Sequence, residues 1–266
     1  MSTLQWKRLG RPNVAWPSEP LRGKTLGMSR WRFHWIGLLI LLICGVMQAQ
    51  AQPRLEIAAE STQESLSPYT AYFHDSDGRA DLTAALAHLS EQRFRPLPDG
   101  DSSFGFQTGA YWFHATLLNR NPAEQRWLLV QDYALSDKID VYARYPDGHL
   151  VHYVGGDSHP FEQRSIRYRH PNFWLNLPLD TPVQLFVRVE SQSSMQVPLS
   201  LYTPTAFTEL ARNSELGIGI YYGILLALFF YNLVLWLALR DASYFWYLFH
   251  ISAFGLVLFT LNGLGF

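Results

Sequence analysis

Two long apolar runs end the chain, and the polar positions before them follow a different pattern. The first run, Leu216–Leu239, holds no charged residue and only one strongly polar residue, Asn232. As a helix it is roughly 36 Å long, which exceeds a bilayer core of about 30 Å. The second run, Tyr244–Phe266, also lacks Asp, Glu, Lys and Arg. We predict a membrane hairpin with spans at 216–239 and 244–266; the alternative for the first run is a buried core helix.

A shorter apolar run lies near the beginning of the chain. Ile36–Val46 follows Arg30 and Arg32 and precedes the sequence Ala49-Gln50-Ala51. A charged region, a short apolar region and an A-x-A site together indicate a secretory signal peptide, so we predict cleavage after Ala51. We interpret Met28 as the true start, which makes residues 1–51 an over-extended N-terminus plus the signal peptide. An uncleaved anchor helix is the alternative.

Between these segments the pattern changes to strand-like alternation. Val183, Leu185, Val187 and Val189 fall on one face of a strand, with Phe186 as an exception on the polar face. Further short apolar segments are separated by Gly, Pro and Asp turns, which predicts an antiparallel β-sandwich over residues 66–204. Residues 52–65 are a weakly patterned lead-in, and residues 205–215 are predicted to be a linker helix that enters the first span.

Composition narrows the classes of function. The net charge of −1 and the mean hydropathy of −0.04 combine a polar N-terminal part with an apolar C-terminal part. No basic stripe supports nucleic-acid binding. The single cysteine, Cys44, excludes an intrachain disulfide. The sequence lacks metalloprotease, nucleophile-elbow, P-loop and paired-cysteine motifs, so no catalytic residue is predicted and a sandwich-fold enzyme is the least favoured class.

Aromatic and arginine side chains of the predicted sandwich are candidates for binding a ligand. Aromatic rings offer flat faces for stacking, although burial in the core is the competing interpretation for Trp112. The polar stretch 157–170 carries three arginines that suit an anionic or sugar ligand on a rim, or that form an ordinary solvated loop. The candidate residues are Trp112, Tyr142, Arg164, Arg167, Arg169 and Trp174.

Three carboxylates form a second candidate site. Asp132, Asp137 and Asp140 offer the oxygen ligands that calcium prefers, but their spacing is not that of an EF-hand loop. The competing interpretation is that they are solvated carboxylates at turns and strand edges. Calcium is therefore the one cofactor that the sequence suggests.

Small and polar residues in the first span are candidates for helix packing. Gly219 and Gly223 form a G-x-x-x-G pair, which permits close approach of another helix. Asn232 is predicted to hydrogen-bond a neighbouring helix rather than a ligand. Tolerance of glycine within a membrane helix is the alternative explanation for the pair.

Short stretches in a fixed order resemble a known family. In the predicted sandwich they are Gly109–His114, Trp127–Tyr133, Asp137–Tyr142, Gly155–Asp157, Pro160-Phe161, Arg169–Leu177, Leu185–Ser191 and Val197–Pro204. In the apolar part they are Gly219–Ile224, Tyr231–Leu233, Leu239–Asp241, Tyr244 and Leu261–Gly265. The order resembles the bacterial seven-transmembrane receptors with diverse intracellular signalling modules, the 7TMR-DISM family, with its type-2 extracellular sensor domain over Leu66–Pro204.

The resemblance implies a jelly-roll sandwich, similar to carbohydrate-binding modules, that lies outside the cell. It also implies a seven-helix bundle and a cytoplasmic output domain, such as a histidine kinase or a diguanylate cyclase. Only two spans and no output domain are present in this sequence. We therefore interpret the chain as a fragment of such a receptor or as a shortened relative.

The leading hypothesis is a sensor in the bacterial inner membrane, multi-pass, with its N-terminal domain in the periplasm. Its expected partners are a small-molecule or carbohydrate ligand, the lipid bilayer, and either a second copy of the chain or a partner signalling protein. Ligand binding would act by population shift through the linker and the first span. The alternative is a membrane-anchored carbohydrate-binding or adhesion module without signalling.

Overall fold

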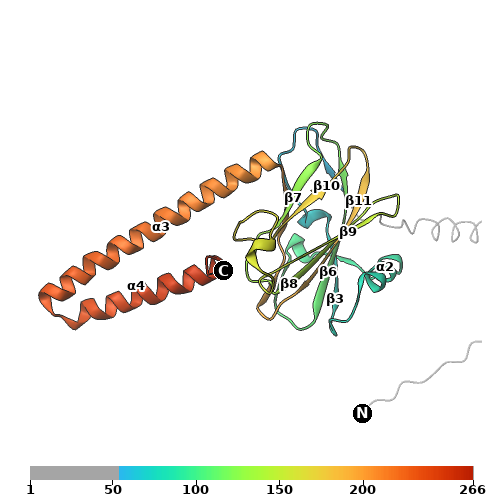
Figure 1. Cartoon of the computed structure of the whole chain (residues 1–266). Coiled ribbons are helices and arrows are strands. Elements are labelled where there is room, and N and C mark those ends of the chain that lie inside the picture. Colours follow the sequence, from blue (N-terminus) through green and yellow to red (C-terminus); the bar gives the residue numbers. More distant parts are fainter. Residues whose placement is uncertain (1–53, 266) are drawn as a thin grey trace, which may run out of the picture. The chain divides into compact units, whose positions relative to one another are not determined.

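The computed structural model describes residues 54–265, which form two large β-sheets and a two-stranded ribbon, followed by two long helices (Figure 1). The predicted signal peptide and its cleavage site lie outside these residues. The fold class expected from the sequence, a mainly antiparallel β region followed by apolar helices, is confirmed. The jelly-roll connectivity stays a prediction.

The larger sheet has seven strands in the order β4-β3-β6-β11-β8-β9, with β1 added beside β6. All neighbours are antiparallel except β1 and β6, which run parallel. The strands are β1 (Leu55–Ile57), β3 (Ala71–Asp75), β4 (Arg95–Pro96), β6 (Ala110–Asn119), β8 (Lys138–Arg144), β9 (Leu150–Gly155) and β11 (Pro182–Glu190).

The smaller sheet has four antiparallel strands in the order β10-β7-β13-β2. They are β10 (Asn172–Asn176), β7 (Arg126–Gln131), β13 (Leu199–Tyr202) and β2 (Gln63–Ser65). A separate ribbon pairs β5 (Ser103–Phe106) with β12 (Ser194–Gln196). The short helices are η1 (Ser67–Tyr69), α2 (Leu82–Ser90), η2 (Pro98–Gly100) and η3 (Phe161–Gln163).

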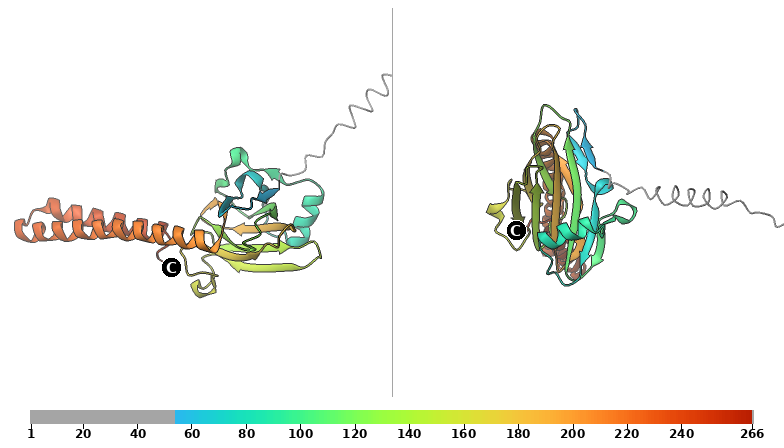
Figure 2. Two further views of the ribbon diagram at one scale, coloured as in Figure 1. Left: turned by 90° about the horizontal axis from the view of Figure 1, so that it is seen from above. Right: turned by 90° about the vertical axis from the view of Figure 1, so that its right-hand side faces the viewer.

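The main core lies between the two sheets, as the face-to-face layers in Figure 2 show. Val183, Leu185 and Val187 of β11 point into this core, as their alternation predicts. Phe186 points the other way and is nevertheless buried, because it packs with Trp112 in a second cluster beneath α2. The exception in the strand pattern therefore marks the place where a helix covers the outer face of the larger sheet.

The lead-in predicted at 52–65 contributes two strands to the sandwich. β1 pairs with β6 through Leu55 and Leu117, and β2 pairs with β13 through Ser65 and Ser200. Each of these strands has only three residues, which is too short for period-2 alternation to be recognised in the sequence. The sandwich therefore begins nearer to residue 55 than to residue 66.

The linker and the first span are one continuous helix, α3 (Pro204–Leu239), rather than two elements. Thr203 caps this helix, because its hydroxyl accepts a hydrogen bond from the Ala206 amide. Arg240 adopts a left-handed conformation with φ of 57°, and Asp241 then caps α4 (Ala242–Leu261), which packs against α3.

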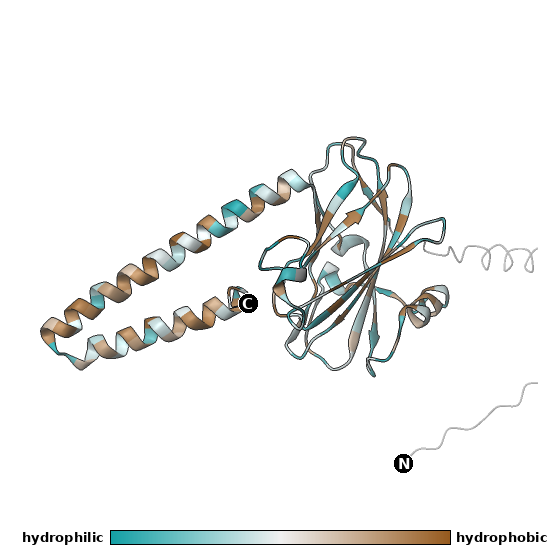
Figure 3. Ribbon diagram, in the orientation of Figure 1, coloured by the Kyte–Doolittle hydropathy of each residue, from teal (hydrophilic) through white to brown (hydrophobic). Residues whose placement is uncertain are grey.

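Both helices are long and apolar enough to cross a membrane. Figure 3 shows hydrophobic residues over most of α4 and over α3 beyond its first turns. Large apolar side chains such as Leu226, Phe230 and Phe249 are exposed. An exposed apolar surface of this extent requires lipid or further helices around it.

Candidate functional site

The first turns of α3 pack on the outer face of the smaller sheet. Phe207 is only 2% exposed and lies against the rings of Tyr168 and Tyr202, with ring centroids 5.1 and 6.1 Å apart. Leu128 and Val130 of β7 complete this cluster, and Leu210 packs at its edge. β7 is therefore buried on both faces, which explains its continuous run of apolar residues. We call this contact the helix junction.

Polar contacts tie the loop before β10 to the same helix. The Arg169 Nη2 atom donates a hydrogen bond to the Ser214 hydroxyl, two residues before the apolar part of α3 begins at Leu216. The Arg169 guanidinium also lies 5.0 Å from the centroid of the Tyr168 ring. His170 Nδ1 is 3.4 Å from an Asp132 carboxylate oxygen. The loop thus holds the helix by both an aromatic ring and a charged side chain.

Burial raises the pKa of Tyr168, and the hydrogen bond to Ser214 and the charge of Arg169 act in the opposite direction. The residue therefore stays protonated at neutral pH and remains a hydrogen-bond donor in the junction. Its contacts reach both the sheet and the helix.

The conformation of this loop is fixed from within. Arg164 Nη1 donates to the carbonyl oxygens of Tyr168 and Arg169, at 2.8 and 2.7 Å. The Asn172 side chain accepts from the Ile166 amide at 2.8 Å and donates to the Ile166 carbonyl at 3.0 Å. Satisfied backbone groups of this kind limit the freedom of a loop. Movement of Arg164 would therefore be transmitted to Arg169.

Besides Asp132, the carboxyl group of Asp157, which follows β9, lies near this loop. Burial and the neighbouring charge of Asp137 raise the pKa of Asp157, and the charge of Arg164 partly offsets them. Gly156 directly precedes Asp157 and has a φ of 113°. A Cβ added to Gly156 would be 2.3 Å from the Asp137 carbonyl oxygen. Only glycine suits this position, because an L side chain would clash and strain the backbone.

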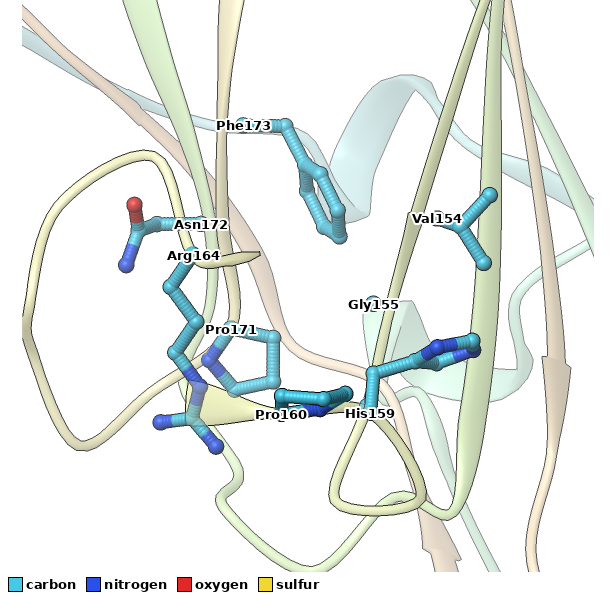
Figure 4. A pocket seen from close by; sticks show the side chains of 9 residues that line it. Val154, Gly155, His159, Pro160, Arg164, Pro171, Asn172 and Phe173 are labelled. Atoms are coloured by element: carbon cyan, nitrogen blue, oxygen red, sulfur yellow. The ribbon is translucent and has the colours of Figure 1, made fainter. Parts of the chain in front are cut away.

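A small cavity opens beside these groups, between β9 and β10 (Figure 4). The Phe173 ring points into it from β10, opposite Val154, with Arg164 at its edge. Its volume is about 10 Å³, which is room for about one water molecule. It is too small for an organic ligand.

The six predicted ligand residues do not form one site. Arg164, Arg169 and Trp174 lie at or near the helix junction, where Trp174 packs on the cluster under a guanidinium of Arg126 at 4.3 Å. Arg167 is exposed on the same loop. Trp112 and Tyr142 belong to the other sheet.

Trp112 is 0% exposed beneath α2, so it belongs to the core and offers no stacking face. Tyr142 is half-buried and stacks between Trp112 and His152, with centroid distances of 5.9 and 4.2 Å. The competing interpretation of Trp112 as a core residue therefore matches the structure. Tyr142 is occupied on both faces by other rings of the protein.

The three predicted calcium ligands lie in separate contacts. Asp132 lies beside His170, Asp140 beside His152 and Arg188, and Asp137 accepts a hydrogen bond from the Gln192 amide. Among residues 54–265, no group of three His, Cys, Asp or Glu side chains is placed to hold a metal ion. The geometry gives the calcium hypothesis no support.

The predicted packing residues differ in their surroundings. A Cβ added at Gly219 or Gly223 would meet no other atom within 4 Å, so this pair does not contact α4. Asn232 is buried, and its amide donates to the Leu228 carbonyl of its own helix at 2.8 Å rather than to a neighbouring helix. The glycine face of α3 is free to contact a further helix.

The sequence did not predict an open groove at the edge of the larger sheet. Its volume is about 580 Å³, within the range of small-molecule sites. The lining residues are Tyr72, Phe73, His74, Gln92, Arg93, Arg95 and Tyr111. In the sequence this groove is visible only as two separate features, an aromatic segment at 69–73 and two arginines at 93 and 95. Only the fold brings these segments together.

Two family matches cover most of the described chain. Residues 67–203 match the family described as 7TMR-DISM extracellular 2. Residues 214–266 match the family described as 7TM diverse intracellular signalling. Residues 204–213, the first turns of α3, lie between the two matches and include Phe207 of the helix junction. A comparison with curated proteins finds no match.

Proposed function

Since this chain belongs to the 7TMR-DISM family of membrane receptor sensors, we propose that its outward sandwich binds a small ligand and passes the bound state to α3 through the helix junction. The observation that carries this proposal is the direct contact of the ligand-facing domain with the helix. Phe207 is buried in the sandwich, and Arg169 binds Ser214 just before the apolar segment.

The continuity of α3 supports transmission along the helix. Residues Pro204–Leu239 form one helix, so a displacement of Phe207 or Ser214 displaces the apolar segment with it. A ligand shifts such an equilibrium only if it binds the two arrangements of the sandwich with different affinity. The loop that holds Arg169 is the element that we propose has two arrangements.

We place the protein in the bacterial inner membrane, with the sandwich in the periplasm and Arg240 at the cytoplasmic face. This orientation agrees with the positive-inside tendency, although Arg212 lies on the other side. Alkaline phosphatase fused after Ser214 should be active, and a fusion after Asp241 should be inactive. The reverse result would overturn the orientation.

As the family resemblance implies, the output would be a histidine kinase or a diguanylate cyclase.

Hydrogen exchange of the full chain in lipid nanodiscs tests the junction. Arg169→Ala removes the hydrogen bond to Ser214, so we expect amide exchange over residues 204–215 to become about tenfold faster. Arg167→Ala is the matched control, because Arg167 is exposed on the same loop. Equal exchange in the two variants would show that Arg169 does not hold the helix.

A ligand screen tests the receptor function itself. The full chain in detergent is screened by thermal shift against monosaccharides, sugar acids and aromatic acids. A binder should change amide exchange over residues 204–215, and Arg169→Ala should reduce that change. A binder that raises the unfolding temperature without changing exchange there would contradict coupling and favour the anchored binding module.

A further inference from the structure

The groove beside β3 has an aromatic wall. Tyr72 and His74 lie on one face of β3, and Tyr111 faces His74 from β6 in the strand register. The His74 and Tyr111 rings stack with centroids 4.3 Å apart and planes 19° apart. Tyr72 is nearly parallel to Tyr111, at 6.2 Å and 16°. The His74 ring is held by a 2.9 Å contact with the Thr108 carbonyl oxygen.

The edge of the sheet is open at this wall. β4 pairs only with Ala71 and Tyr72, through Pro96 and Arg95. Phe73 and His74, the next two residues of β3, extend beyond β4 and line the groove from its edge. Tyr72, Phe73 and His74 are each partly exposed, so parts of these rings are accessible to a ligand.

The groove also has a cationic side, where Arg95 lies beside Tyr72 in the strand register. Arg93 and Arg95 both line the groove, and no carboxylate is among the lining residues. Arg93 is paired with Glu91 at 2.8 Å, whereas Arg95 forms no ion pair with any carboxylate of the described residues. An exposed guanidinium suits a carboxylate, because its planar fork donates two parallel hydrogen bonds.

We infer that this groove binds a small ring compound that carries a carboxylate. The ring lies against Tyr72 and His74, and the carboxylate pairs with Arg95. Stacking on the aromatic wall and charge pairing with Arg95 beside it are both required, because an exposed ion pair alone contributes little. The inference rests on the proposed sensor function and deepens it by assigning the ligand class and its place.

Aromatic acids and sugar acids share this chemistry, and direct binding to the full chain in detergent distinguishes them. The probes are 4-hydroxybenzoate and galacturonate, with 4-hydroxybenzyl alcohol and galactose as their neutral counterparts and acetate as the acid without a ring. One of the two ring acids should bind at least about tenfold more tightly than its neutral counterpart and than acetate. If neither ring acid binds, the inference is wrong.

Variants locate the binding. Arg95→Gln should weaken the binding of the ring acid about tenfold, because a charge-assisted pair is lost. Arg144→Gln is the matched control, since Arg144 is also exposed and lies on the strand β8. Tyr72→Leu should weaken binding while the preference for acid over neutral ligand remains. Equal affinity in Arg95→Gln and in the unaltered chain would overturn the groove as the site.

The exchange experiment separates the two proposals. A ring acid that binds in an Arg95-dependent manner without changing exchange over residues 204–215 would support the groove and contradict the coupling. A different ligand that changes exchange in Arg95→Gln as in the unaltered chain would support the coupling and contradict the groove.

Discussion

His114 lies on β6 among aromatic side chains that bury its imidazole. It packs against Phe186 and Phe94, with ring centroids 4.7 and 5.9 Å apart. Burial lowers the pKa of His114 from 6.5 to about 4. The folded protein therefore holds a neutral imidazole over a pH range in which the unfolded chain binds a proton.

We predict that this histidine makes folding acid-sensitive. The stabilisation is complete above pH 6.5, the ordinary pKa, and is lost as the pH falls toward 4. The loss amounts to about 2–3 kcal/mol. Denaturant unfolding of the full chain in detergent at pH 7 and pH 4.5 measures it. In His114→Gln the difference between these two pH values should be smaller by that amount; an unchanged difference would contradict the assignment.

Asp157 gives the opposite pH dependence. Its pKa is raised by burial and by the charge of Asp137, so the protonated form is favoured in the folded protein. Its contribution to stability is present below 3.8, the ordinary pKa, and is lost as the pH rises through the raised value. The unfolding temperature of Asp157→Asn, relative to the unaltered chain, should therefore increase between about pH 3.5 and 6.5. A relative temperature independent of pH would refute this.

At the scale of elements, the hydrophobic period and the length of a helix or strand determine whether the sequence predicts it. β11 has nine residues whose alternation is broken only at Phe186, and α3 and α4 have long uncharged runs, so the sequence predicts these elements. β1 and β2 have three residues each and depend on β6 and β13 for their pairing. Their existence is decided by tertiary contacts that no local pattern contains.

The candidate site was less predictable than the fold. Arg164 and Arg169 were identified, but their partners are backbone carbonyls and Ser214, which only the folded loop brings near. Trp112 was ambiguous because α2 decides its burial. The groove combines β3 with residues after α2 and one residue of β6. Residue type suggests chemistry, whereas the distance between segments follows from the topology.

Phe207 provides a test at the level of the α3–sheet contact. Truncation by Phe207→Ala removes a buried ring between Tyr168 and Tyr202, so we expect a loss of about 3 kcal/mol in unfolding free energy. The neighbouring variant Glu209→Ala is the control, because Glu209 is exposed. Denaturant unfolding of the full chain in detergent measures the difference. Equal stability of the two variants would show that this part of α3 does not contribute to the sandwich.

At the scale of the whole molecule, coupling between the sandwich and the bilayer must be reciprocal. If ligand binding shifts α3, then a condition that shifts α3 must change ligand affinity by the same factor. A thinner or thicker bilayer changes the tilt of a membrane helix. If the proposed coupling holds, the membrane is an effector of the proposed ligand site.

Bilayer thickness gives the corresponding prediction. Affinity for a ligand found by the screen should differ by about fivefold or more between vesicles of short-chain and long-chain phosphatidylcholine. The matched control is Arg169→Ala, in which this difference should decrease because the hydrogen bond to Ser214 is lost. Equal affinity in both lipids would favour an anchored binding module that does not signal.

Because α3 is unbroken from Pro204 to Leu239, the number of residues in it fixes the angular orientation of its apolar part. Each inserted residue turns everything downstream by about 100° and moves it by about 1.5 Å. Two residues inserted after Glu215 would turn the glycine face of α3 by about 200°, whereas four would return it to within about 40° of its original direction. If signalling reads rotation, four added residues are tolerated better than two; if it reads depth, the order reverses. The contacts of Phe207 and Ser214 with the sandwich would then set the rotational orientation of the whole helix about its axis.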